Sequence, residues 1–121
     1  MERLFILTDQ FEKQLKAFDN SDDLLQDIEE EINKDLETPF SSRDVIKGTG
    51  GFTKIRIPLK IHKIGKSGAL RVIYLDSPQF NVVFLMMVYS KSNFSNLSDL
   101  GRQTLKEIGQ ELKEWRPKKR S

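Results

Sequence analysis

The spacing of apolar residues changes at Val45, and this change limits the possible folds more than any other feature of the sequence. Before Val45, apolar side chains recur at helical spacing, as at Phe11, Leu15 and Phe18, which predicts an amphipathic helix. After it, residues 52–57 alternate between two faces, which is typical of a strand. The sequence therefore predicts a mainly helical first part followed by a sheet.

The predicted elements follow the order strand, two helices, three strands and a final helix. The strands are expected at residues 3–8, 52–57, 70–75 and 80–89, with a turn at 76–79. The strand at 80–89 is apolar on both faces, which predicts a place in the middle of the sheet. This order predicts an α+β fold, in which an N-terminal strand and helical hairpin precede an antiparallel sheet with a C-terminal helix.

Capping residues and a proline mark the ends of the helices. The first helix is expected to begin at Thr8 or Asp9, the second at residues 20–23 and the last at Ser98. Pro39 ends the second helix, because the residue before a proline disfavours helical geometry. The packing stripe is expected at Leu25, Ile28, Ile32 and Leu36 in the second helix, and at Leu105, Ile108, Leu112 and Trp115 in the last.

Length and composition exclude several classes of protein. The chain has 121 residues, the size of one domain, and no cysteine, which excludes disulfides, thiol nucleophiles and cysteine-ligated metals. The longest apolar run, residues 82–89, is far shorter than the about 20 residues that cross a bilayer. We therefore expect a single cytoplasmic domain over residues 1–121, with an acidic part (1–44), a basic part (45–115) and a basic tail (116–121).

The net charge of +2 conceals a strong separation of charge along the chain. Residues 1–44 carry 5 basic and 13 acidic side chains, whereas residues 45–121 carry 15 basic and 5 acidic ones. Such a separation indicates a polyanionic partner for the basic part. The alternative is that the two sets of charges interleave on the folded surface and cancel, because charge blocks in a sequence need not become surface patches.

Two glycine-rich segments and the lone histidine do not favour other chemistries. Residues 65–67 (GKS) lack the earlier glycine of a P-loop, and residues 48–53 (GTGGFT) end in a threonine with no helix after it. His62 has no other metal ligands near it in the sequence, so an exposed histidine is the better interpretation. The acidic residues cluster on a predicted helix face, which does not favour a two-carboxylate hydrolase.

The predicted strands bring basic residues together. The candidates are Lys54, Arg56, Arg71 and Lys91 on or beside the strands, with Lys63, Lys66 and Tyr89 near them. Lys54 and Arg56 lie on one face of their strand, about 7 Å apart, and Arg71 opens the next strand. If the strands pair in chain order, these groups converge on one site for a polyanion. The alternative is a scatter of strand-edge cations that prevent edge-to-edge aggregation.

These residues belong to segments that resemble the HigB-type toxins of the RelE superfamily. Residues 44–56 read DVIKGTGGFTKIR, residues 65–74 read GKSGALRVIY and residues 88–91 read VYSK, each similar to a motif of that family. Order and spacing agree over residues 44–112, with Thr53 and Ala69 replacing a basic residue and a glycine of the family pattern. The resemblance implies a RelE-like fold.

The same resemblance implies an activity and partners. HigB-type toxins of type II toxin–antitoxin systems are endoribonucleases that cleave messenger RNA in the ribosomal A site, without a metal or other cofactor, and a helix-turn-helix antitoxin inhibits them. The resemblance implies catalytic positions for Lys54, Arg56, Arg71 and Lys91, and RNA contacts for Lys66 and Tyr89. The basic loop adds Lys63 as a further RNA contact. The alternatives are a gyrase inhibitor of the ParE type, which shares the fold, and a binding module without ribonuclease activity.

The residue types fit a reaction in which a 2′-hydroxyl attacks the adjacent phosphorus. Arginine side chains such as Arg56 and Arg71 can stabilise the negative charge that develops on the phosphate oxygens. No histidine pair is available, but a lysine crowded by other cations has a lowered pKa and can exchange a proton near neutral pH. We therefore expect Lys54 to act as the base, with Arg71 or Lys91 assisting the leaving 5′-oxygen.

Overall fold

The computed structural model describes residues 3–58, 70–90 and 99–113. In chain order the elements are β1 (Leu4–Leu7), α1 (Asp9–Leu15), α2 (Ser21–Leu36), the 3-10 helix η1 (Phe40–Ser42), β2 (Thr53–Ile57), β3 (Leu70–Ser77), the 3-10 helix η2 (Pro78–Phe80), β4 (Val82–Ser90) and α3 (Asp99–Lys113). The predicted order of elements and the α+β class are confirmed. The predicted roles of Ser98, Trp115 and the tail at 116–121 fall outside the described residues.

The four strands form one sheet in the order β1-β4-β3-β2. The strands β2, β3 and β4 are antiparallel neighbours, whereas β1 runs parallel to β4. The predicted interior strand is therefore confirmed, because β4 lies between β1 and β3. Residues of β4 belong to the apolar clusters on both sides of the sheet, so both of its faces are buried, which explains its uninterrupted apolar sequence.

Two predicted boundaries are wrong by a few residues. The turn expected at 76–79 begins later, because Asp76 and Ser77 still pair with β4, and the chain turns at η2 instead. The first helix ends at Leu15, so Phe18 lies beyond it, although its ring still packs against the core. At the turn, pairing with β4 extends the strand beyond the local turn signal. At the helix, Phe18 contacts the core from outside the helix, although its spacing suggested a longer helix.

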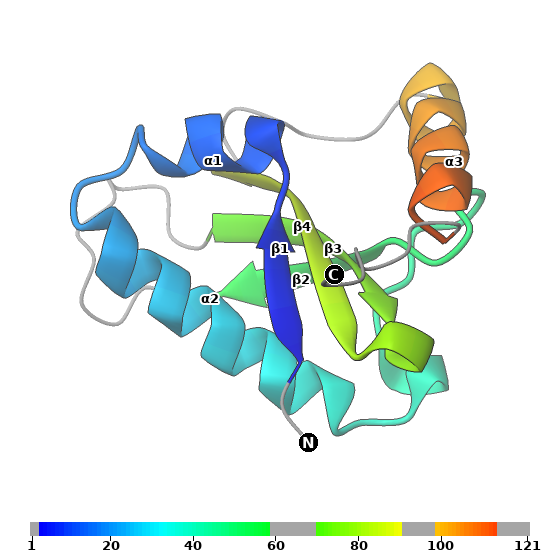
Figure 1. Cartoon of the computed structure of the whole chain (residues 1–121), viewed down its shortest axis with the longest axis horizontal. Helices are drawn as coiled ribbons and strands as arrows, with labels where there is room; N and C mark the ends of the chain where they lie inside the picture. Colours follow the sequence, from blue (N-terminus) through cyan, green and yellow to red (C-terminus); the bar gives the residue numbers. More distant parts are fainter. Residues whose placement is uncertain (1–2, 59–69, 91–98, 114–121) are drawn as a thin grey trace, which may run out of the picture.

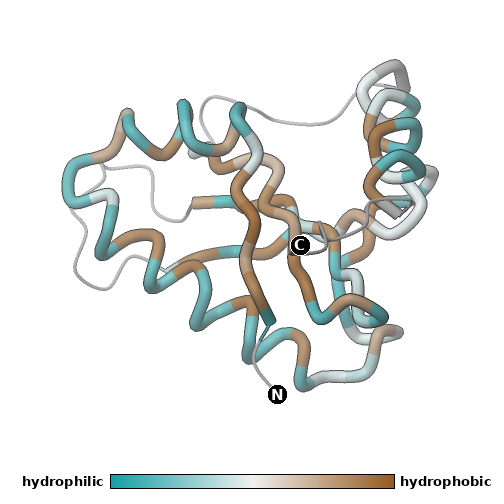
Figure 2. Tube along the Cα trace, in the orientation of Figure 1, coloured by the Kyte–Doolittle hydropathy of each residue, from teal (hydrophilic) through white to brown (hydrophobic). Residues whose placement is uncertain are grey.

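The helices α1 and α2 cover one face of the sheet, and α3 covers the other (Figure 1). The helix α2 presents Leu24, Ile28 and Ile32, all fully buried, to the sheet. The predicted stripe began one residue late, since Leu25 is only partly buried at the side of this row. Figure 2 shows the resulting alternation of apolar and polar residues along α2. Among the described residues, no helix has the length and hydropathy needed to cross a membrane.

The helix α3 approaches its face of the sheet at a glycine. Leu105 of α3 is buried in one apolar cluster with Phe52, Ile73 and Phe84. A methyl group on Gly109 would lie 3.0 Å from a ring carbon of Phe52, so the absence of a side chain at Gly109 allows this close contact. Glycine inside a helix costs about 1 kcal/mol relative to alanine, and here the cost is offset by the burial of the aromatic ring.

Candidate active site

Three of the predicted site residues form a row across three neighbouring strands. Arg56 of β2 pairs with Arg71 of β3, and Arg71 pairs with Tyr89 of β4. Directly paired residues point to the same face of a sheet, and neighbouring strands lie about 4.8 Å apart. We call Arg56, Arg71 and Tyr89 the arginine row. Lys54 lies two residues before Arg56, and therefore on the same face.

The arginine row lies on the face that α3 covers in part. Lys54 pairs with Ile73, which pairs with Met87, and Ile73, Met87 and Tyr89 belong to the same apolar cluster as Leu105 of α3. The basic residues thus share this face with the apolar cluster beneath α3, and Tyr89 is in contact with that cluster. The predicted convergence of the basic residues required β2, β3 and β4 to be antiparallel neighbours. The sheet has this arrangement, and it brings together Lys54, Arg56, Arg71 and Tyr89.

A bulge in β4 determines the face on which Tyr89 lies. Ile73 pairs with Met87, but the next residue, Tyr74, pairs with Leu85, so that Met86 is an extra residue in β4. Leu85 packs toward α1 and α2, and strict alternation would place Tyr89 on that same face. Because one extra residue reverses the alternation, Tyr89 lies beside Arg71 instead.

Arg71 has an unusual environment for a cation. The side chain is partly buried, its Nη1 atom is inaccessible to solvent, and no described residue accepts a hydrogen bond from this nitrogen. A buried donor without an acceptor destabilises a fold, and phosphate oxygens are the acceptors that a guanidinium binds most strongly. Arg71 is also on an interior strand, so protection of a sheet edge does not explain it.

Asp44 lies beside the candidate residue Lys54, a neighbour that the sequence did not indicate. Its Oδ2 lies 3.9 Å from Nζ of Lys54, with 68% of the Asp44 side chain and 42% of the Lys54 side chain exposed. The backbone fixes the pair, because the Lys54 N–H donates to the Asp44 carbonyl at 2.9 Å. In the sequence, Asp44 is one of 13 acidic residues in the first 44, and nothing in that pattern indicates that it lies near Lys54. Its place at the start of the segment DVIKGTGG could have drawn attention to it.

The glycine-rich segment folds back to place Asp44. Gly48 and Gly50 have φ angles of 78° and 79°, which residues with a side chain rarely adopt. The resulting loop is closed by a hydrogen bond of 2.8 Å from the Ile46 N–H to the Phe52 carbonyl. Thr49 is fully buried and donates to the Ile46 carbonyl at 2.6 Å. The segment therefore bends the chain back toward β2.

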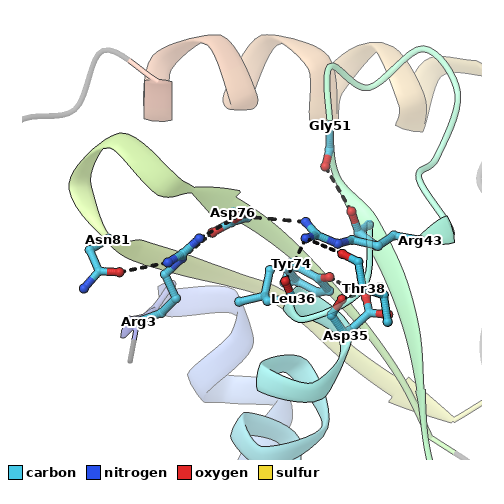
Figure 3. A network of polar contacts seen from close by, with 10 residues as sticks. Arg3, Asp35, Leu36, Thr38, Arg43, Gly51, Tyr74, Asp76 and Asn81 are labelled. Atoms are coloured by element: carbon cyan, nitrogen blue, oxygen red, sulfur yellow. Dashed lines mark hydrogen bonds and ion pairs between the residues drawn. The ribbon is translucent and has the colours of Figure 1, made fainter. Parts of the chain in front are cut away.

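Arg43 anchors the chain immediately before Asp44 (Figure 3). Its Nη2 donates to the carbonyl groups of Leu36 and Thr38, each at 3.0 Å, at the C-terminal end of α2. Its Nη1 lies 3.9 Å from the Asp76 carboxylate on β3. These contacts tie the segment that follows α2 to the sheet, and so limit where Asp44 can lie.

The same network reaches the N-terminal end of β1 and the end of α2 (Figure 3). Arg3 donates to Asp76 at 2.8 Å and to the side chain of Asn81 at 2.9 Å. The Tyr74 hydroxyl donates to Asp35 of α2. Burial, and then the hydrogen bond to Asp35, raise the pKa of Tyr74 far above its usual value, so this hydroxyl remains a donor.

Tyr89 presents a neutral phenol to the site. Burial raises the pKa of Tyr89; the positive charge of Arg71 opposes this shift, and the negative charge of Asp44 adds to it. The hydroxyl is therefore protonated at neutral pH, where it can donate a hydrogen bond. The charges that act on it come from both neighbours in the site, Arg71 and Asp44.

The remaining predicted residues have different outcomes. Lys63, Lys66 and Lys91, together with His62, lie outside the described residues. Thr53, which replaces a basic residue of the family pattern, is buried and its hydroxyl donates to the Gly51 carbonyl at 3.2 Å. Because position 53 is buried, the replacement of a basic residue by Thr53 does not remove a positive charge from the exposed surface. Among the described segments, no three side chains of the metal-ligating types lie together.

A solved structure shares this architecture, although no protein-family model matches the sequence. The neighbour is a double arginine-to-alanine variant of the E. coli toxin RelE in its free state, with a TM-score of 0.52 and 19% sequence identity. The match covers 89% of this chain and 99% of the RelE chain. The chain has the RelE fold. The RelE-like architecture that the sequence motifs implied is thus confirmed.

Proposed function

We propose that this protein is a HigB-type toxin of a type II toxin–antitoxin system, and that it is a ribosome-dependent endoribonuclease that cleaves messenger RNA in the A site. The observation that carries the proposal is the arginine row beside Lys54 on a RelE fold. It places an exposed guanidinium group, a partly buried one and a lysine on one face of the sheet, with a neutral phenol at its end. That set of groups suits a phosphodiester of RNA better than a neutral ligand.

In the proposed reaction, the 2′-hydroxyl of one nucleotide attacks the adjacent phosphorus and the 5′-oxygen leaves. Lys54, in its neutral form, takes the proton of the 2′-hydroxyl, and the Asp44 carboxylate, 3.9 Å from its Nζ, orients the amine. Arg56 and Arg71 stabilise the charge that develops on the phosphate oxygens. The leaving oxygen is assisted by Arg71 or by Lys91, as expected from the sequence.

The groups assigned to this reaction require no metal or other cofactor. Permanently charged guanidinium groups stabilise an oxyanion directly, and a fixed donor aimed at such a charge contributes about 10²–10³ in rate. The partners proposed are messenger RNA on the cytoplasmic ribosome, with Lys63 and Lys66 contributing further contacts to RNA, and a helix-turn-helix antitoxin that inhibits the enzyme. The acidic part of the chain supplies a complementary surface for a basic partner segment.

The test is inducible expression followed by primer extension on one translated message, with and without a block of translation. We expect cuts within translated codons that disappear when translation is blocked. Lys54→Ala and Arg71→Ala should each reduce the cuts about 10²-fold or more, whereas Lys106→Ala, on an exposed position of α3, should not change them. Growth arrest with DNA damage and no cuts would favour a ParE-type inhibitor, and no growth arrest would favour a binding module.

A further inference from the structure

A cavity of about 340 Å³ lies beside the end of β4, next to the arginine row. Gln10, Gln14 and Phe18 line it on the side of α1, and Met87 and Tyr89 line it on the side of the strand. Tyr89 therefore belongs both to the wall of this cavity and to the arginine row. We call this space the Gln14 cavity.

The cavity exists because β4 is longer than its neighbour β1. The pairing of the two strands ends at Leu7 and Leu85, after which the chain leaves the sheet at Thr8 and enters α1. Thr8 caps this helix, accepting from the Phe11 N–H at 3.3 Å, and its hydroxyl donates to the Leu85 carbonyl at 2.9 Å. Beyond this point the edge of β4 faces the side of α1 instead of a strand.

Gln14 occupies this open edge in a fixed orientation. The Val88 N–H donates to Oε1 of Gln14 at 2.9 Å. An N–H group must face the oxygen and not the nitrogen of an amide, so this bond determines which end of the Gln14 side chain is the NH₂ group. No described residue accepts a hydrogen bond from that NH₂. Gln14 therefore presents oriented donors at the wall of a largely apolar cavity.

These features match the requirements of an unstacked nucleobase. Proteins that read single-stranded RNA pack the base against aromatic and apolar side chains and form hydrogen bonds to its edge. Phe18 and Met87 supply apolar walls, and the NH₂ of Gln14 supplies a donor for a ring nitrogen or carbonyl oxygen. Because Arg71 and Tyr89 are on neighbouring strands about 4.8 Å apart, a phosphate on the arginine row would bring an adjoining base to the cavity.

We propose that the Gln14 cavity binds one nucleobase of the RNA strand whose backbone lies on the arginine row, and that Gln14 determines which base is preferred there. This inference rests on the proposed function, since it assumes that the row binds an RNA backbone. It adds a specificity-determining position on α1, which none of the sequence motifs contains.

The first test is a titration of the isotope-labelled protein followed by NMR. The probes are AMP, GMP, CMP and UMP, with ribose 5-phosphate and inorganic phosphate as controls that lack a base. We expect all six to shift the Arg71 Nε–H signal, and only the nucleotides to shift the side-chain NH₂ signals of Gln14. The shifts at Gln14 should also differ in size among the four bases.

A matched pair of variants tests the role of the donor. Gln14→Glu keeps an oxygen for the Val88 N–H but removes the NH₂, whereas Gln26→Glu makes the same change of charge on an exposed position of α2. Loss of one such hydrogen bond should weaken binding of the preferred nucleotide about three- to tenfold for Gln14→Glu and leave it unchanged for Gln26→Glu. Protection of the Val88 amide from hydrogen exchange shows that the local fold is intact.

The outcomes separate this inference from the proposed function. If wild-type protein cleaves messenger RNA but ribose 5-phosphate shifts the Gln14 signals as much as AMP does, the cavity does not bind a base. The same conclusion follows if Gln14→Glu cuts at the same nucleotides as wild type. If no probe shifts Arg71 and no cleavage occurs, the proposed function itself fails. Changed cut sites in Gln14→Glu, with base-dependent shifts in wild type, would support the inference.

Discussion

Replacement of Arg71 by methionine should stabilise the fold while it strongly reduces cleavage. In the structure, Nη1 of Arg71 is buried without an acceptor among the described residues, and Arg71 directly faces Arg56 across the strand pair. A buried unpaired donor lowers the free energy of unfolding by about 1–3 kcal/mol. Like charges directly opposite each other on paired strands lower it further, by a smaller amount. Methionine retains most of the apolar length of the arginine side chain and removes both costs.

The expected gain is therefore about 1–3 kcal/mol in the free energy of unfolding. For a chain of 121 residues, the average unfolding entropy per residue converts 1 kcal/mol into a change of about 4 °C in Tm. The melting temperature of Arg71→Met should thus lie about 4–12 °C above that of wild type. Cleavage should fall about 10²–10³-fold, because a donor to the developing oxyanion is lost.

Differential scanning calorimetry and urea unfolding at fixed pH and ionic strength measure this change. Arg56→Met is the matched control, because it relieves the same repulsion between the two arginines but removes an exposed side chain, where substitutions change stability by about 0.5 kcal/mol or less. The difference in the free energy of unfolding between the two variants therefore gives the cost of the buried, unpaired nitrogen of Arg71. A melting temperature of Arg71→Met at or below that of Arg56→Met would refute the reasoning.

Three further predictions concern packing, pH and the carboxylate of the site. Gly109→Leu should lower the free energy of unfolding by about 1–3 kcal/mol, because the ring beneath α3 leaves no room for a side chain, and calorimetry would detect this loss. Burial raises the pKa of both tyrosines, Tyr74 and Tyr89, so above about pH 10 the unfolded chain ionises first and stability falls as pH rises. Urea unfolding between about pH 8 and 11 should show a smaller fall when both tyrosines are phenylalanine. Asp44→Asn should lower cleavage at least about tenfold, because Lys54 loses the carboxylate that orients it. Urea unfolding should show a stability unchanged within about 0.5 kcal/mol. Cleavage equal to that of wild type would show that Asp44 is not part of the site.

The sequence predicts the elements well because their signals are local. The period of the apolar residues identifies α2 and the strands, and the apolar run of β4 identifies its interior place in the sheet. The placement of Lys54 and Arg56 on the same face of their strand also follows from strand geometry alone. The errors are at element ends, such as the turn after Ser77 and the helix that stops before Phe18, where distant contacts outweigh local preference.

The candidate site is only partly predictable for the same reason. The sequence identifies the basic residues, but not that Asp44 returns to Lys54 through a loop of left-handed glycines. Nor does it identify Gln14, whose amide is oriented by the N–H of Val88, 74 residues away in the chain. Such contacts between distant residues produce no periodic pattern of apolar and polar residues in the sequence.

The amino-acid sequence by itself determined which segments form helices and strands, and which basic residues the sheet carries. The tertiary structure alone decided that Tyr89 stands beside Arg71, because the extra residue Met86 reverses the alternation of β4. Local patterns arise from steric and solvation effects between near neighbours, which a short window of sequence records. Register and bulges instead minimise the free energy of the whole packed sheet, and therefore become visible only when all of its strands are in place.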